Sequence, residues 1–318
     1  MSTIEKALGS LVKQTSARQE SPPRPVERVE SAAMPSSSRA DGERPSREAV
    51  AKQDKPRVSI PFDALHGLGF ITPIAPRSMV AEEFRVVKRP LLKNISGKSA
   101  HPIPNANLVM VTSALEGDGK TFSSLNLAIS IAMEQDKTVL FVDADVLKAT
   151  AGSLLGVPAG ALGLIDLLRD ESVKPENVIL ETNLENLRVL PAGRPDAQAT
   201  ELLAGRDMHQ LMMEMSARYP DRVIVFDSPP LLLTTESGVL ANFMGQIVFV
   251  VAADITPQHA VLEALEHIGP EKFVAVMLNR VSRRKLGLFG KGYGYGYGYG
   301  YGYGYGSARL DESAGRAD

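Results

Sequence analysis

The chain has 318 residues, of which 44% are hydrophobic, and its formal net charge is −2. This charge provides no global field that attracts nucleic acid, and the lack of cysteine excludes disulfide frameworks and thiolate metal sites. No segment approaches the run of about 18 apolar residues that spans a membrane. The first residues lack the basic start and apolar run of a signal peptide. We therefore expect a cytoplasmic protein with no nucleic-acid partner.

The N-terminal region divides into a short helix and a linker. Apolar residues at helical spacing predict an amphipathic helix within residues 1–17, which is either a weakly helical end or a docking helix. Residues 18–57 are rich in Ser, Pro, Arg, Glu and Ala and have almost no large apolar side chains. Such a segment cannot bury enough surface to offset its ordering entropy, so we predict a disordered linker over 18–62. One globular domain is expected over 63–286, followed by a low-complexity tail.

A second helical pattern covers residues 79–93. Glu82, Arg85 and Lys88 follow one another at three-residue steps, which brings neighbouring charges together on the helix surface. Taken alone, this spacing fits a solvated helix face with internal ion pairs. Pro90 has no backbone N–H, so we expect it to interrupt or end the helix.

From residue 107 onwards, apolar strands alternate with helices. Continuous apolar strands separated by helices indicate an α/β fold, in which a mostly parallel sheet is covered on both faces. In such sheets ligands bind at the carboxyl ends of the strands, where Asp143, Asp227 and Asn279 are placed. Strands are expected at 107–113, 138–142, 187–190, 222–226, 247–252 and 273–278, and helices at 121–135, 199–219 and 258–268.

The segment between the first of these strands and the first helix has the pattern of a phosphate-binding loop. Gly117 and Gly119 allow backbone N–H groups to turn toward an anion at a helix N-terminus. Lys120 is placed to reach the β- and γ-phosphates, and the hydroxyl of Thr121 to bind Mg²⁺. The usual pattern has a further glycine where this chain has Ala114, so the loop is of a deviant type.

Two acidic motifs follow apolar strands. Asp143 and Asp145, two residues apart, can both lean toward a bound Mg²⁺. Asp227, before Ser-Pro-Pro, has the position of a Walker-B carboxylate in the metal shell. In each case a polar cap on a strand end is the alternative. The amide of Asn279 is suited to reading an adenine edge, although a turn-forming Asn explains it equally well.

The C-terminal tail over 287–318 alternates tyrosine with glycine and holds seven of the eight tyrosines of the chain. These phenolic groups are candidate phosphoacceptors on a tether. The alternative is a low-complexity segment in which tyrosine serves weak stacking. The candidate acceptors are Tyr293, Tyr295, Tyr297, Tyr299, Tyr301, Tyr303 and Tyr305.

With these motifs, the chain resembles the bacterial tyrosine kinases, which use Walker motifs on a P-loop NTPase fold. Within that family it is similar to the cytoplasmic autokinases of exopolysaccharide loci, and its N-terminus resembles an exosortase-associated subgroup. The resemblance implies ATP and Mg²⁺ as cofactors, with transfer to the tail between subunits. It implies catalytic roles for Lys120, Asp143 and Asp145, metal ligation by Thr121, Asp143 and Asp227, and nucleotide contacts by Gly117, Asp118, Gly119, Lys120, Thr121, Phe122, Asn279 and Arg280.

The resemblance also implies partners. The family pattern Glu-x-x-Arg-x-x-Arg, which mediates ring-like self-association, matches Glu82, Arg85 and Lys88, with Lys in place of the second Arg. Lys keeps the charge but loses the bidentate fork. A separate membrane protein of the polysaccharide co-polymerase type is expected to activate the kinase and to hold it at the inner membrane. The family's Leu-Arg-Arg-Pro after the first acidic motif is replaced by residues 146–149, Val-Leu-Lys-Ala.

Two other functions remain open at this point. A partition or site-placement ATPase shares the fold and three motifs, but such proteins need no tyrosine tail and often carry a lysine early in the loop. A non-catalytic scaffold, in which ATP binding organises a polysaccharide assembly complex, fits the altered acidic motif.

Overall fold

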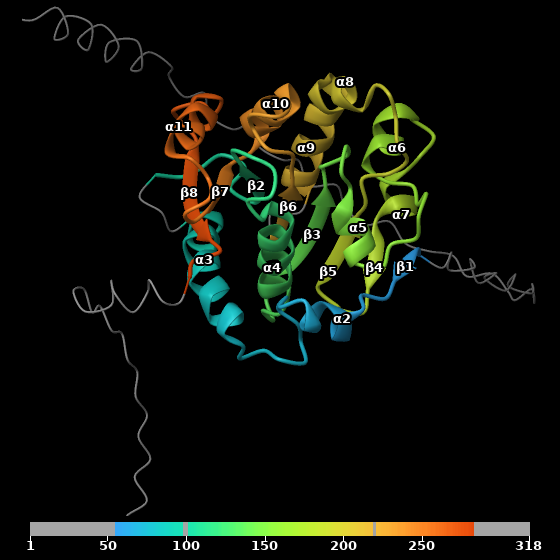
Figure 1. Ribbon diagram of the computed structural model, residues 1–318. Helices are drawn as coiled ribbons and strands as arrows, with labels where there is room; N and C mark the ends of the chain where they lie inside the picture. Colours follow the sequence, from blue (N-terminus) through green and yellow to red (C-terminus); the bar gives the residue numbers. More distant parts are fainter. Residues whose placement is uncertain (1–54, 98–100, 219–220, 283–318) are drawn as a thin grey trace, which may run out of the picture. The chain divides into compact units, whose positions relative to one another are not determined.

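The computed structural model describes residues 55–97, 101–218 and 221–282 (Figure 1). Within these residues the chain forms one eight-stranded sheet with the order β1-β4-β5-β3-β6-β2-β7-β8. The helix predicted within 1–17, most of the predicted linker and the tyrosine cluster lie outside the described residues. No helix in the described part of the chain is long and apolar enough to cross a membrane.

The sheet is mostly parallel, as predicted. Every neighbouring pair of strands is parallel except β4 and β5, which are antiparallel. The strands are β1 (Arg57–Val58), β2 (Leu108–Ser113), β3 (Thr138–Asp143), β4 (Leu180–Thr182), β5 (Leu187–Leu190), β6 (Arg222–Asp227), β7 (Gln246–Ala252) and β8 (Phe273–Asn279).

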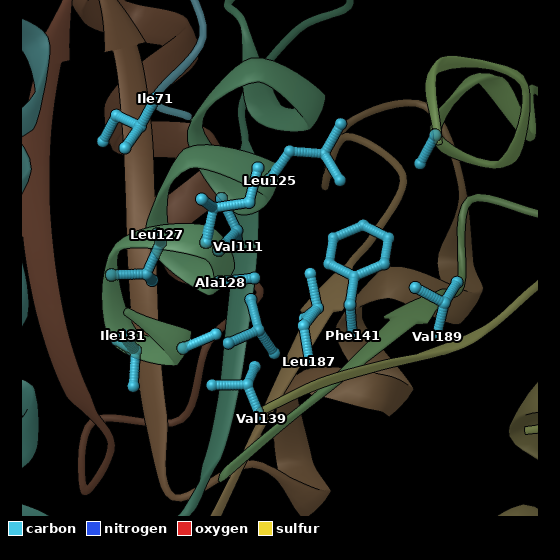
Figure 2. Close-up of a cluster of buried hydrophobic side chains, with 14 of the residues drawn as sticks. Ile71, Val111, Leu125, Leu127, Ala128, Ile131, Val139, Phe141, Leu187 and Val189 are labelled. Carbon is cyan, nitrogen blue, oxygen red and sulfur yellow. The ribbon is translucent and has the colours of Figure 1, made fainter. Parts of the chain in front are cut away.

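Helices cover both faces of the sheet, and each face has its own apolar core. One core includes residues of α2 (Phe62–Gly67), α3 (Met79–Ile95), α4 (Lys120–Ala132) and α5 (Thr150–Leu154). The opposite core includes residues of α6 (Leu164–Arg169), α7 (Pro175–Val178), α8 (Ala199–Ala204), α9 (Arg206–Arg218), α10 (Thr235–Phe243) and α11 (Gln258–Glu266). Figure 2 shows the first core, where side chains of α4 pack with those of β2, β3 and β5.

The two cores explain why the central strands are apolar without alternation. Successive side chains of a strand point to opposite faces. In β3, Val139 and Phe141 belong to the first core, while Leu140 and Val142 belong to the second. Because both faces are buried, neither set can be polar.

The structured region begins earlier than the sequence pattern predicts. Arg57 of β1 pairs with Glu181 of β4, and Ile60 is 2% exposed. The predicted boundary between linker and domain at residue 63 is therefore too late. The single helix expected over 199–219 is also wrong, because Gly205 adopts an extended conformation that separates α8 from α9.

Pro90 does not interrupt or end its helix, contrary to the expectation, since α3 continues to Ile95. The carbonyl group that loses its helical N–H partner belongs to Val86, which is exposed, so water can satisfy it. The following turn is held by packing, because Leu91 is fully buried and Asn94 donates a hydrogen bond to Gln246 Oε1 at 2.8 Å. Tertiary contacts thus outweigh the local preference of proline.

Lys88 attaches α3 to α4. Its Nζ lies 2.7 Å from Glu134 Oε1 and donates to the carbonyl oxygen of Ser130 at 2.6 Å. Lys88 is buried, whereas Arg85 is half-buried and Glu82, with which it forms an ion pair, is exposed. The three residues of the predicted self-association pattern therefore do not share one accessible surface, since the step of six residues from Glu82 to Lys88 places them about 240° apart around the helix.

Candidate nucleotide-binding site

The phosphate-binding loop connects β2 to α4 at the carboxyl edge of the sheet. Gly117 and Gly119 have φ angles of +86° and +97°, and Gly119 is the N-terminal cap of α4. Only glycine adopts this left-handed region readily, so the two glycines define the bend of the loop. Lys120 is the first residue of α4 and is buried. The free N–H groups and positive dipole of a helix N-terminus make this place suited to an anion.

Asp143 and Asp227 lie side by side in front of this loop. They end the neighbouring parallel strands β3 and β6 and are paired in the register of the sheet. Each is 1% exposed. One oxygen of Asp143 accepts from the backbone N–H of Gly152 at 3.2 Å. The other oxygen, and both oxygens of Asp227, have no hydrogen-bond partner of normal geometry in the described residues.

These two carboxyl groups have strongly perturbed proton affinities. Burial raises the pKa of Asp227 to about 7, although the nearby hydroxyl of Thr121 and the ammonium of Lys120 act in the opposite direction. Burial, and then repulsion from Asp227, raises the pKa of Asp143 well above its usual range. Two neighbouring buried carboxyl groups with only one hydrogen bond of normal geometry between them are costly as a pair of anions. A cation bound between the strand ends and Thr121 would remove that cost.

Asp145 lies farther out on the same strand end. Its Oδ1 accepts from the backbone N–H of Lys148 at 3.3 Å. Burial raises the pKa of Asp145, while the ammonium of Lys120 lowers it. Lys148, which stands in the altered family motif, forms an ion pair with Glu116 of the phosphate loop. The replacement segment thus contacts the phosphate loop through that ion pair.

The residues present fit Mg²⁺ bound together with nucleotide phosphates. This ion takes oxygen ligands and usually uses one or two carboxylates plus phosphate oxygens. Asp143, Asp227 and Thr121 offer this donor set. Among the described residues, no group of three or more His, Cys, Asp or Glu side chains is arranged to hold a metal by itself.

Of the residues expected to contact nucleotide, three have side chains that pack or hydrogen-bond within the protein, and a fourth has an exposed side chain. The Phe122 ring packs against those of Phe70 and Phe84, at centroid distances of 4.9 and 6.5 Å. Asp118 points into the protein and is 2% exposed. The Nδ2 of Asn279 donates to the backbone carbonyl of Asp118, and its Oδ1 accepts from the backbone N–H of Arg280. The side chain of Arg280 is exposed.

One residue near the loop was not anticipated. Thr256, between β7 and α11, donates a hydrogen bond to Asp118 Oδ1 at 2.6 Å. A lone threonine 138 residues after its partner has no sequence pattern that would reveal such a contact.

Comparisons with known proteins agree with this geometry. The model of an AAA domain family matches residues 107–260, from the start of β2 into α11. The tyrosine-protein kinase YwqD of Bacillus subtilis is 30% identical over 217 residues, which are 68% of this chain and 87% of YwqD. The succinoglycan biosynthesis transport protein ExoP of Rhizobium meliloti is 29% identical over 220 residues, 68% of this chain but 27% of ExoP.

A solved structure has the same architecture. The crystal structure of the chimerical protein CapA2B2 aligns with a TM-score of 0.59 and 26% sequence identity, and the match covers 72% of this chain and 96% of that one.

Proposed function

Because the chain belongs to the bacterial tyrosine kinase family, we propose that it is an ATP-dependent protein-tyrosine autokinase that phosphorylates its own C-terminal tyrosine cluster and thereby regulates exopolysaccharide synthesis or export. The observation that carries this proposal is the pair of buried carboxyl groups, Asp143 and Asp227, with unpartnered oxygens in front of a phosphate-binding loop. A member of this family that also holds seven clustered tyrosines has both a donor site and an acceptor.

The loop binds the triphosphate of ATP. Its backbone N–H groups and the N-terminus of α4 face the phosphates, and the ammonium of Lys120 spreads the charge that develops on the transferred phosphoryl group. Thr121, Asp143 and Asp227 would hold Mg²⁺, which would neutralise phosphate charge. A cation there would also keep both carboxyl groups ionised, although burial alone favours their protonated forms.

The acceptor phenol needs a base, since the pKa of tyrosine is about 10. Asp145 and Asp143 are the two candidates. Burial raises the pKa of Asp145, and a carboxylate with a raised pKa accepts a proton more readily at neutral pH. Asp143 would accept a proton less readily while it holds Mg²⁺. In this mechanism the phenol proton passes to the carboxylate while the phenol oxygen bonds to phosphorus and ADP leaves.

The tail has the reach for transfer between subunits. β8 ends at Asn279, beside the phosphate loop, and Tyr299 follows twenty positions later in the chain. Fully extended, this length spans roughly 70 Å. The tail of one copy therefore reaches the site of a neighbour in a ring-like homo-oligomer.

The outer surface of α3 supports self-association. Met79 and Val86 are exposed on this helix together with Glu82, and exposed apolar side chains flanked by charges suit a contact between copies. Lys88 is bonded inside the fold, so the interface we propose uses Glu82 and Arg85 without it.

A membrane protein of the co-polymerase type is the activator in this proposal, and it keeps the cytoplasmic kinase at the inner membrane. The chain matches 27% of ExoP, a transport protein by name.

Incubation with labelled ATP and Mg²⁺, followed by mapping of phosphotyrosine by mass spectrometry, tests the proposal. We expect label on the tyrosines from Tyr293 to Tyr305, and none in a Lys120→Met variant. A partition-type ATPase would hydrolyse ATP without labelling the tail, and a scaffold would bind ATP without consuming it. Either result, obtained with the activator present, would contradict an autokinase.

A further inference from the structure

Two residues outside the phosphate loop, Thr256 and Asn279, hydrogen-bond to Asp118 inside it. The side chain of Asp118 accepts two hydrogen bonds. Its Oδ2 accepts from the backbone N–H of Leu115 at 3.1 Å, and its Oδ1 accepts from the hydroxyl of Thr256 at 2.6 Å. The first bond closes the loop on itself, and the second ties it to the segment that follows β7.

The hydroxyl proton of Thr256 has a defined direction. Its Oγ1 accepts a hydrogen bond from the backbone N–H of Ala252 at 3.0 Å. A hydroxyl has a single proton to donate, and here that proton points to the carboxylate of Asp118. Hydrogen bonds to an ionised acceptor are about twice as strong as neutral ones. The chain from Ala252 through Thr256 to Asp118 thus anchors the loop to the last residue of β7.

Asn279 forms a second anchor. Its Nδ2 donates to the backbone carbonyl of Asp118 at 2.9 Å. This side chain lies against Gly119, where an added Cβ would be 2.0 Å from Nδ2. Gly119 is therefore required both for its left-handed φ and for the space that Asn279 occupies.

We infer that Asp118, Thr256 and Asn279 form a clamp that fixes the phosphate loop in its binding conformation before nucleotide arrives. The three are positioning residues. Their side chains hydrogen-bond within the loop or link it to the segments after β7 and at the end of β8, and none of them contacts the reacting atoms. The inference rests on the proposed function and specifies how its nucleotide site is preorganised. A loop with two glycines is otherwise free to adopt many conformations, and ordering it during binding would reduce affinity.

The clamp gives Asn279 a role that differs from reading adenine. A clamp that orders the phosphate loop affects the binding of any triphosphate, whatever base it carries. An adenine reader acts on the base alone.

Thr256→Val tests the first anchor, since it keeps the shape of the side chain and removes the hydroxyl. In the full chain we expect the Kd of a fluorescent ATP analogue to rise about tenfold, which corresponds to about 1.4 kcal/mol. Thr256→Ser keeps the hydroxyl and should restore binding to within about twofold. Thr200→Val, the same change on the surface helix α8, should leave the Kd unaltered. An unchanged Kd in Thr256→Val would overturn the inference.

Asn279→Ala separates the two roles of the asparagine. The clamp predicts that ATP, GTP and inorganic tripolyphosphate all bind more weakly by a similar factor. A loss confined to ATP would assign Asn279 to the adenine and remove it from the clamp.

Hydrogen exchange of the nucleotide-free protein provides a readout that does not depend on activity. The amides from Gly117 to Lys120 should exchange faster in Thr256→Val than in the wild type, while those of β2 remain protected. Equal exchange would contradict the clamp. If the wild-type chain bound no nucleotide, the proposed function would fail, and this exchange measurement would still decide whether the clamp exists.

Discussion

The burial of Asp227 has a cost in the nucleotide-free protein that can be measured as a dependence of stability on pH. The group is 1% exposed, its oxygens have no partner of normal geometry in the described part of the chain, and burial raises its pKa from 3.8 to about 7. The folded state therefore holds a proton that the unfolded chain releases. Stability from this group is fully present below pH 3.8 and is lost as the pH rises through about 7.

Asp227→Asn removes this titration while keeping the size of the side chain. A shift of about three pKa units corresponds to about 4 kcal/mol over the full range, and this loss accumulates between pH 3.8 and about pH 7. Because the variant never buries the charge, we expect it to be more stable than the wild type by roughly 1 to 2 kcal/mol at pH 5. At pH 8 the difference should have grown to about 4 kcal/mol.

Urea unfolding of the nucleotide-free proteins from pH 5 to pH 8 measures this difference. Asp166→Asn is the matched control, because the pKa of Asp166 is shifted in the opposite direction from that of Asp227. Burial raises the pKa of Asp166, but hydrogen bonds from Arg194 and Gly163 outweigh burial and leave that pKa lowered. The control variant should therefore be less stable than the wild type at neutral pH. A difference between Asp227→Asn and the wild type that stays constant with pH would refute the reasoning.

Added ATP and Mg²⁺ should stabilise the wild type more than Asp227→Asn at pH 8. A ligand that binds only the folded state stabilises it by mass action, and the wild type alone keeps the carboxylate that the ion needs. Stabilisation of Asp227→Asn by ATP and Mg²⁺ to the same extent would exclude Asp227 from the metal shell.

Other outcomes follow from the same structure. Replacing all seven tail tyrosines with Phe should remove most phosphate incorporation and leave the Kd for ATP unchanged, and a lost affinity would contradict a tail that serves only as acceptor. Arg85→Glu should lower the mass measured by light scattering, whereas Lys88→Met should keep that mass and destabilise the fold by about 2 kcal/mol, since a buried charged hydrogen bond is lost. If only the Lys88 variant changed the mass, the interface assignment would be wrong. Saturating the tail with phosphate, each adding a charge of about −1.5 to −2, should also lower the mass, and an equal mass would reject this switch.

The phosphate loop and the strand ends beside it can be predicted from the sequence because they depend on local properties of the chain. A phosphate loop depends on glycine conformations and on a helix start, which are local properties of the chain. The central strands are buried on both faces, so their apolar runs are visible without knowledge of their neighbours, as in β3 and β6. The position of Asp143 beside Asp227 then follows from the parallel pairing of these strands.

Other features depend on contacts that no local pattern encodes. The helices α5, α6 and α7 have four to six residues, too few to display a period. The sequence spacing of Lys88 is that of a charge on a helix surface. In the structure its Nζ forms an ion pair with Glu134 and donates a hydrogen bond to the carbonyl oxygen of Ser130 in α4. Thr256 reaches the loop only because the end of β7 lies next to β2 in the sheet.

Transfer between two distinguishable copies tests the central claim most directly. One copy carries Lys120→Met and an intact tail, and the other carries an intact site and a tail in which every tyrosine is Phe. With ATP, Mg²⁺ and the activator, we predict phosphotyrosine between Tyr293 and Tyr305 of the Lys120→Met copy. If that tail remains unlabelled in the mixture while the intact copy binds ATP, the chain is not the trans-acting tyrosine kinase that its site and tail indicate.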